Sequence, residues 1–137
     1  MLGLEEIMKC DKAPADLDPA KLAQENDLLD RVNKIRTAWG KPMTVTSGIR
    51  TWADQLRIYA AKGITDPHKI PSKSHHLETV LDSAAVDIYD PGLEITAWLK
   101  ANPSILEDAG LYCEEGNSNW VHFQNIAPAS GNRWFLP

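Results

Sequence analysis

Two short segments combine the alternation of a β-strand with a single side chain that can bind a metal. In residues 84–89 apolar side chains flank Asp87, and in residues 120–125 they flank His122. Successive side chains of a strand point to opposite faces, so the apolar neighbours would pack in the core and leave Asp87 and His122 on the other face. An unpaired buried carboxylate is costly, so Asp87 needs a partner. Two neighbouring strands can therefore present a carboxylate and an imidazole to one cleft.

The other elements indicate an α+β domain. Asp18 as N-cap, Pro19 as first helical residue and Gly40 as terminator bracket a helix with apolar residues at helical spacing. The β-branched residues 43–47 predict a strand, and Thr51 can cap a second helix. Four residues of that second helix are expected to face inward: Ala53, Leu56, Tyr59 and Ala60.

The second half is expected to hold a long loop, two helices and a hairpin. Residues 63–82 are polar and contain three of the four histidines, and a loop of this length in a small domain is more often functional than idle. A helix over 93–101 and a shorter one ending at Gly110 follow. Strands over 111–114 and 120–125 then flank a turn of Gly116, Asn117 and Ser118. We expect one domain over 1–137, with 1–20 as an irregular N-terminal segment.

Composition limits the partners. The net charge of −5, without a run of Lys or Arg, argues against nucleic acid. No apolar run is long enough to span a bilayer, and the first residues lack the pattern of an export signal. We expect a monomer without membrane insertion, made in the cytoplasm and delivered by other means if it acts outside. The two cysteines, Cys10 and Cys113, are expected to be free thiols.

A histidine of the polar loop would complete a metal site. His75 and His76 precede the strand of Asp87, and two histidines with one carboxylate suit Zn²⁺ while leaving the fourth tetrahedral position open for water. Two other interpretations stay open from the residues alone. His122 could be a hydrogen-bonded structural residue, and Asp87 could cap the strand end or pair with Arg50.

Three motifs in this order resemble a known family. Ser74-His75-His76 comes first, Ala85-Val86-Asp87-Ile88 follows, and Trp120-Val121-His122-Phe123 stands near the end. They resemble the S-x-H, G-x-A-x-D and W-x-H motifs of the zinc D-alanyl-D-alanine carboxypeptidase and phage endolysin peptidase family. The stretch Ser47-Gly48-Ile49-Arg50 is similar to the family's S-G-[FYI]-R segment. The resemblance covers about residues 22–137, and the end of the chain is similar to small phage or prophage members.

The resemblance implies a Hedgehog/DD-peptidase fold, in which an antiparallel sheet lines a zinc cleft. His76, Asp87 and His122 map to the zinc ligands. Arg50 maps to the arginine that engages a substrate carboxylate or polarised carbonyl, with Ser47 and Trp120 as further substrate-binding positions.

The sequence departs from the family at two places. The interval between the first ligand and Asp87 is longer, and Ser83 replaces a glycine, so His75 competes with His76 as first ligand. The acidic residue expected three positions before His122 is Asn119, which cannot act as a base. Glu114 is the expected general base, with Glu115 as the alternative.

The implied function is hydrolysis of a peptide bond in peptidoglycan stem peptides. The enzyme would be a D-Ala-D-Ala carboxypeptidase or an endolysin-type endopeptidase acting on the cell wall, with one zinc ion as cofactor. The alternative is a non-catalytic peptidoglycan-binding or phage structural module of the same fold.

Overall fold

The computed structural model describes residues 1–8 and 12–137, so Cys10 lies outside the described residues. A five-stranded mixed sheet forms its centre, in the order β1-β2-β4-β3-β5. The strands span Val45–Ser47 (β1), Ala85–Tyr89 (β2), Tyr112–Glu114 (β3), Trp120–Gln124 (β4) and Trp134–Phe135 (β5). The α+β class is as predicted, but the sheet is not wholly antiparallel, because β5 pairs with β3 in parallel.

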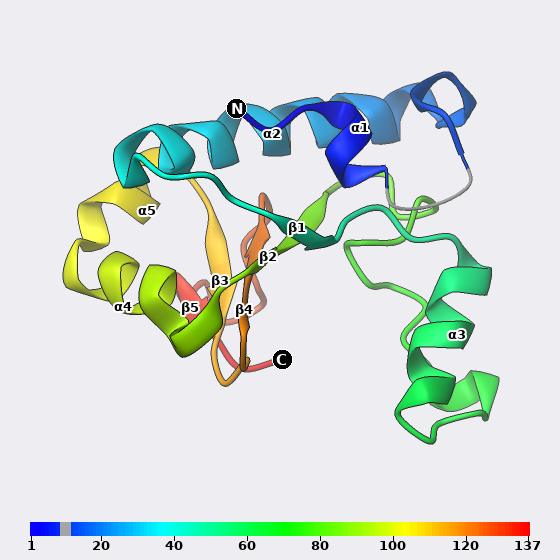
Figure 1. Ribbon diagram of the computed structural model, residues 1–137. Coiled ribbons are helices and arrows are strands. Elements are labelled where there is room, and N and C mark those ends of the chain that lie inside the picture. The colour runs from blue at the N-terminus through cyan, green and yellow to red at the C-terminus, as the bar shows by residue number, and fades with distance from the viewer. Residues whose placement is uncertain (9–11) are drawn as a thin grey trace.

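The helices lie above this sheet and on its two sides in the view of Figure 1. They span Leu4–Ile7 (α1), Pro19–Trp39 (α2), Trp52–Ala61 (α3), Glu94–Ala101 (α4) and Pro103–Ala109 (α5), with 3-10 turns at Pro14–Asp16 (η1), Pro67–Lys69 (η2) and Pro91–Leu93 (η3). The predicted caps of α2 are confirmed, since the Asp18 carboxylate accepts from Ala20 N and Gly40 adopts φ 76°. The N-terminal segment is not irregular throughout, because Leu4–Ile7 is helical and Ile7 is buried.

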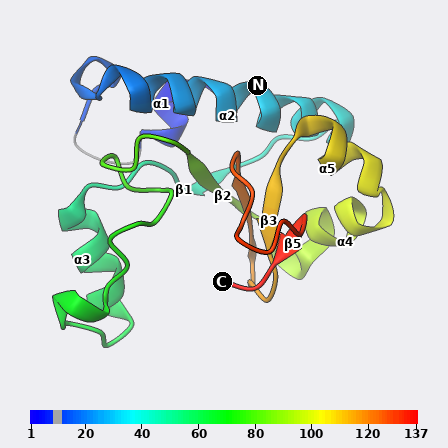
Figure 2. The same cartoon turned by 180° about the vertical axis from the view of Figure 1, so that it is seen from behind.

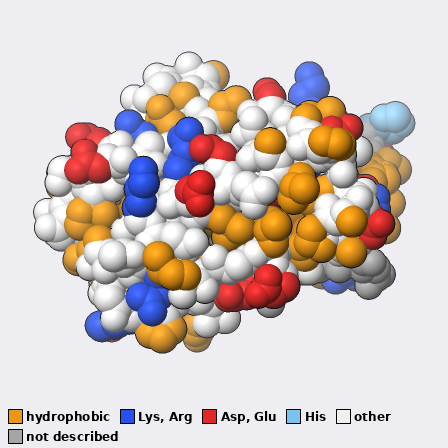
Figure 3. Space-filling model, turned by 90° about the horizontal axis from the view of Figure 1, so that it is seen from above, with side chains coloured by type: hydrophobic (Ala, Val, Ile, Leu, Met, Phe, Trp, Pro, Cys, Tyr) orange, Lys and Arg blue, Asp and Glu red, His pale blue; other side chains and the backbone are white. Residues whose placement is uncertain are grey.

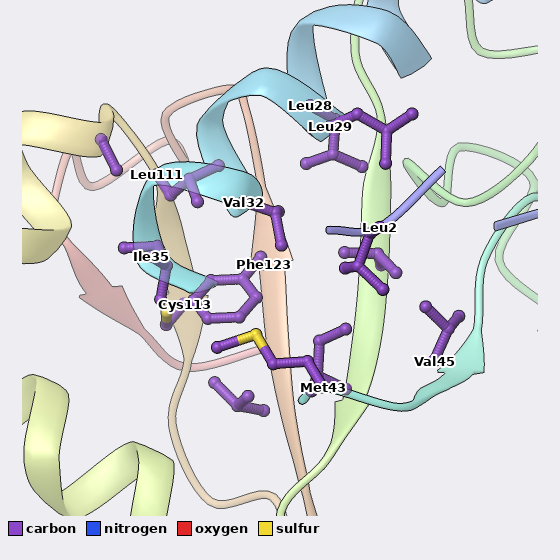
Figure 4. Packing of buried hydrophobic residues seen from close by; sticks show 14 of the residues in the cluster. Leu2, Leu28, Leu29, Val32, Ile35, Met43, Val45, Leu111, Cys113 and Phe123 are labelled. Atoms are coloured by element: carbon purple, nitrogen blue, oxygen red, sulfur yellow. The ribbon is translucent and has the colours of Figure 1, made fainter. Parts of the chain in front are cut away.

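The main core lies between α2 and the sheet. Val32 and Ile35 of α2 pack with Phe123 of β4 and Cys113 of β3, all of them buried (Figure 4). Cys113 is a free thiol, as predicted. The alternation in β2 and β4 is confirmed, because the residues flanking Asp87 and His122 belong to this core. The opposite face of the sheet is therefore left for polar side chains.

Helix α3 stands to one side of the sheet, together with the loop that follows it (Figure 2). Thr51 caps it as predicted, with Oγ1 accepting from Asp54 N at 3.1 Å. The predicted inward face is wrong for Ala53 and Ala60, which are exposed, whereas Gln55 is fully buried. The reason is that α3 does not lie across the sheet and therefore covers no broad apolar surface.

The surface carries mixed charge. Figure 3 shows basic and acidic side chains interspersed on the face seen from above. Among the helices of the described residues, none combines the length and apolar character required to cross a membrane.

Candidate metal centre

Asp87 and His122 are brought together by strand pairing. Strands β2 and β4 are antiparallel, and these two residues are direct partners in the register. Directly opposed residues of a sheet hold their side chains on the same face about 5 Å apart at Cβ. His122 Nδ1 lies 2.9 Å from Asp87 Oδ1. This half of the site therefore follows from the alternation pattern and the register alone.

His76 arrives from the loop before β2. Its Nε2 lies 3.4 Å from Asp87 Oδ1, and its ring centroid lies 5.2 Å from that of His122. The three side chains offer ligand atoms that all lie within 4.8 Å of one another, and all three residues are buried. The triad could therefore hold a metal ion.

The hydrogen bonds around the triad test whether its atoms suit a cation. His76 Nδ1 lies 2.8 Å from the carbonyl oxygen of Gly48, so it carries the proton and leaves the Nε2 lone pair free. His122 Nε2 lies 2.9 Å from Gln124 Oε1, on the side of the ring away from Asp87. Two neutral imidazoles and a carboxylate are the donor set of a catalytic zinc site, so these residues fit that ion.

The electrostatics favour an ionised carboxylate. Burial alone would raise the pKa of Asp87, but the charge of His76 and the hydrogen bond from His122 hold it well below its usual range. Burial lowers the pKa of His76, which favours the neutral ligand form. Burial also acts to lower the pKa of His122, but the hydrogen bond and the charge of Asp87 outweigh it, so the net pKa is raised. The ionised Asp87 is stabilised in this structure by protons on the two histidines, and a bound cation would supply that positive charge instead.

His75, the competing first ligand, faces elsewhere. Its Nδ1 makes a short contact with Ser83 Oγ, and the ring is half-buried beside the triad. Ser83 therefore has a partner that a glycine at this position could not bind. The geometry brings His76 rather than His75 into the triad.

Gly48, whose carbonyl oxygen binds His76, lies very close to the end of α1. A Cβ at this position would lie 2.1 Å from the carbonyl oxygen of Ile7, which belongs to the backbone and cannot move aside. Ile49 N donates to that same oxygen at 2.8 Å. Only glycine therefore allows the end of α1 to approach the turn whose carbonyl oxygen binds His76.

Arg50 connects the loop ligand to the strand ligands. Its backbone N–H donates to His76 O at 2.8 Å, and its carbonyl accepts from Glu78 N at 2.9 Å. Its side chain reaches Asp87, with Nη2 3.6 Å from Oδ2. The alternative of an Asp87–Arg50 ion pair is thus present in the structure together with the histidine triad.

Ser47 and Gln55 hold the Arg50 guanidinium. Arg50 Nε donates to Ser47 Oγ at 3.0 Å, and Nη1 donates to Gln55 Oε1 at 3.2 Å. Gln55 Nε2 in turn donates to the carbonyl of Pro71 at 3.0 Å. The predicted substrate-binding Ser47 thus contacts Arg50. Gln55 has no sequence signal beyond being a polar residue on the buried side of a helix.

The structure separates the two glutamates at the hairpin. Glu114 lines the cleft, and its Oε2 lies 3.8 Å from His122 Nδ1. Glu115 instead pairs with Lys100 at 2.7 Å. Asn119 adopts φ 63° in the turn before β4 and accepts from Asp90 N through its carbonyl, which is a backbone role.

A cleft of about 460 Å³ opens over the triad. Trp120, which the sequence predicts to bind substrate, and Phe135 line the cleft with apolar surface, while Arg50 and Lys62 supply positive charge. Phe135 also meets the His122 ring edge-on, with centroids 6.3 Å apart. Strand β5, which sequence analysis missed because it spans only two residues, is what brings Phe135 here.

Comparison with known proteins gives no relative for this chain. No family model, no curated protein and no solved structure matches it.

Proposed function

We propose that this chain is a zinc-dependent peptidase of the Hedgehog/DD-peptidase fold that hydrolyses a peptide bond in peptidoglycan stem peptides. The observation that carries the proposal is the triad of His76, Asp87 and His122 at the base of a cleft that Glu114 also lines. The order of the sequence motifs supports the same family. In this proposal the protein acts on the cell wall after release or delivery.

The residues of the cleft have separate roles in this proposal. His76 Nε2, His122 Nδ1 and Asp87 would hold the ion, which when bound supplies a Lewis acid and makes a nearby water easier to deprotonate. Glu114 Oε2 accepts the proton of that water and returns it to the leaving amine. Ser47 and Gln55 hold Arg50 in place, so its positive charge can stabilise oxyanion charge without reorganisation.

The cleft walls support a peptide substrate with an acidic end. Lys62 and Arg50 offer two positive charges on the α3 side, and Trp120 and Phe135 offer apolar surface on the other side. A free C-terminal carboxylate would bind the cationic side of a carboxypeptidase, whereas an endopeptidase would use a side-chain or internal carboxylate there. Both modes agree with the proposal.

One experiment tests the proposal. Purified peptidoglycan is incubated with the zinc-loaded protein, and new chain ends are identified by mass spectrometry. Released D-alanine would indicate a carboxypeptidase, and cut stem peptides an endopeptidase. His122→Ala should lose both bound zinc and products.

Two further variants examine the base. Glu114→Gln should retain zinc while turnover falls by about 10²–10⁴-fold, the usual contribution of a general base. Glu115→Gln is the matched control and should stay active, because Glu115 pairs with Lys100 outside the triad. Binding of peptidoglycan without any product would refute the enzyme and favour a non-catalytic binding module.

A further inference from the structure

Gln124 makes two hydrogen bonds from a buried position at the end of β4. It is 3% exposed and lies two residues after His122 on the same face of the strand. Its Nε2 donates to the carbonyl oxygen of Ile126 at 2.9 Å. A carbonyl can only accept, so the amide nitrogen must face Ile126 and the amide oxygen must face His122.

This orientation determines where His122 carries its proton. Gln124 Oε1 lies 2.9 Å from His122 Nε2, and an amide oxygen can only accept. Nε2 is therefore protonated, and Nδ1 is the nitrogen that a metal ion would bind, in place of the proton that Nδ1 donates to Asp87. Nδ1 is the atom that faces Asp87 Oδ1 at 2.9 Å.

Both histidines of the triad are oriented by an oxygen acceptor, but the two acceptors differ in kind. His76 is held by the backbone carbonyl of Gly48, which substitution of a side chain cannot remove. His122 is held by the side chain of Gln124, which substitution can remove. An apolar residue at position 124 would leave a buried Nε2–H without an acceptor and release the ring to the other tautomer.

We infer that Gln124 is the positioning residue of the metal centre, which selects Nδ1 of His122 as the metal-binding atom. The inference rests on the metal site of the proposed function and not on peptide hydrolysis. Partners that orient a metal-binding histidine typically contribute 10–100-fold to metal affinity. The hydrogen-bond chain from His122 through Gln124 to Ile126 is such a support, and it ends on a backbone carbonyl two residues beyond the end of β4.

The test compares zinc affinity and histidine tautomer in matched variants. Gln124→Leu should lower zinc affinity by about 10–100-fold in a competition with a chromophoric chelator. Gln124→Glu keeps an acceptor toward His122 and should stay closer to the wild type. Gln24→Leu makes the same replacement on α2, where Gln24 accepts from Asn125, and should leave zinc affinity unchanged.

NMR of the imidazole nitrogens supplies a readout that needs no metal. At alkaline pH the metal-free wild type should keep a larger share of His122 with the proton on Nε2 than Gln124→Leu, in which the proton should lie on Nδ1 toward Asp87. An unchanged tautomer, or an unchanged zinc affinity in Gln124→Leu, would overturn the inference.

The inference and the proposed function can fail separately. If zinc binding depends on Gln124 but peptidoglycan stays uncut, the inference stands and the peptidase is refuted. If Gln124→Leu binds zinc normally while His122→Ala abolishes cleavage, the peptidase stands and the inference is refuted.

Discussion

The strand-borne and loop-borne halves of the metal centre are held by different means. Asp87 and His122 are direct partners across β2 and β4, so ladder hydrogen bonds and the core beneath set their separation. His76 lies on a loop that depends on separate contacts with Gly48, Arg50 and α2. The difference teaches that one half of the site is as rigid as the sheet, whereas the other is only as stable as its anchors.

The α2 anchor is a buried ion pair. Lys21 Nζ donates to the carbonyls of His75 at 3.1 Å and Ser83 at 2.7 Å, one on each side of the loop. Its counter-ion is Glu25 at 3.5 Å, whose two carboxylate oxygens are buried and make no hydrogen bond. Removing one member of such a pair is strongly destabilising, because it leaves the other charge buried without a counter-ion.

The largest effect is expected on the strand side. Asp87→Asn removes the carboxylate that both histidines and Arg50 face, so zinc affinity should fall further than the about 10–100-fold expected for a residue that only supports a ligand. Chelator competition measures it. Asp90→Asn is the matched control, since Asp90 is a buried aspartate that caps α4 through Ile95 N and Thr96 N. That control should lose stability and keep zinc. An equal loss of zinc affinity in Asp87→Asn and Asp90→Asn would contradict a direct role of Asp87 in holding zinc.

The next effect is expected on the loop side. Lys21→Met leaves Glu25 buried without its cation and two carbonyls without their donor, so the free energy of unfolding should fall by about 3–5 kcal/mol. Denaturant unfolding at mildly alkaline pH measures it. Adding Glu25→Leu should restore the part due to the stranded carboxylate and leave the part due to the carbonyls. An unchanged stability in Lys21→Met would mean that α2 does not anchor the loop.

A pH dependence should distinguish the two halves. Burial raises the pKa of Glu25 to about 7, above its ordinary value near 4.5. The folded state then holds a proton that the unfolded state has released, so this group's contribution to stability falls as pH rises from about 4.5 to 7, by about 3 kcal/mol in total.

Glu25→Gln removes that titration. The free energy of unfolding of the wild type minus that of Glu25→Gln should therefore decrease across this interval, as measured by urea unfolding at several pH values. Asp87 stays ionised over the same range because its pKa is held well below the usual value, and it is present in both proteins. A difference independent of pH would contradict the prediction.

The smallest effect is expected at Ser47. Ser47→Ala removes one of three contacts of the Arg50 side chain, which should cost about 0.5–1.5 kcal/mol of stability and leave zinc affinity unchanged. Thermal unfolding and chelator competition measure the two quantities, with the exposed Ser118→Ala as control. If KM for a peptide substrate rises far more than stability falls, Ser47 contacts substrate as well as Arg50.

More of the strand-borne half of the metal centre than of the loop-borne half could be predicted from the sequence. Alternation predicts which face carries Asp87 and His122, because the period of a strand leaves only two choices. The choice of His76 over His75 came from motif resemblance, since a loop has no period. The contacts of Lys21 and Gly48 that seat this loop join segments far apart in the chain, and no local pattern encodes them.

Other differences have equally specific causes. Strand alternation puts Gln124 on the same face as His122, but no local pattern assigns it a role, because its significance lies in one bond to Ile126. The inward face of α3 was misjudged because spacing shows which residues share a side, not whether anything covers that side. Strand β5 is too short to have a period, so Phe135 was missed as a wall of the cleft.

His75 and Ser83 hold the two ends of the loop between them together, and this closure has a consequence for engineering that loop. Lys21 bridges the two carbonyls, and the His75 and Ser83 side chains meet across the same point. The distance between the metal-binding residues in space is therefore independent of how many residues lie between them in the chain. Residues 79–82 lie beyond this closure and beyond the Glu78 N–Arg50 O hydrogen bond, so a peptide epitope or a reporter could be grafted there while the three ligand atoms keep their places.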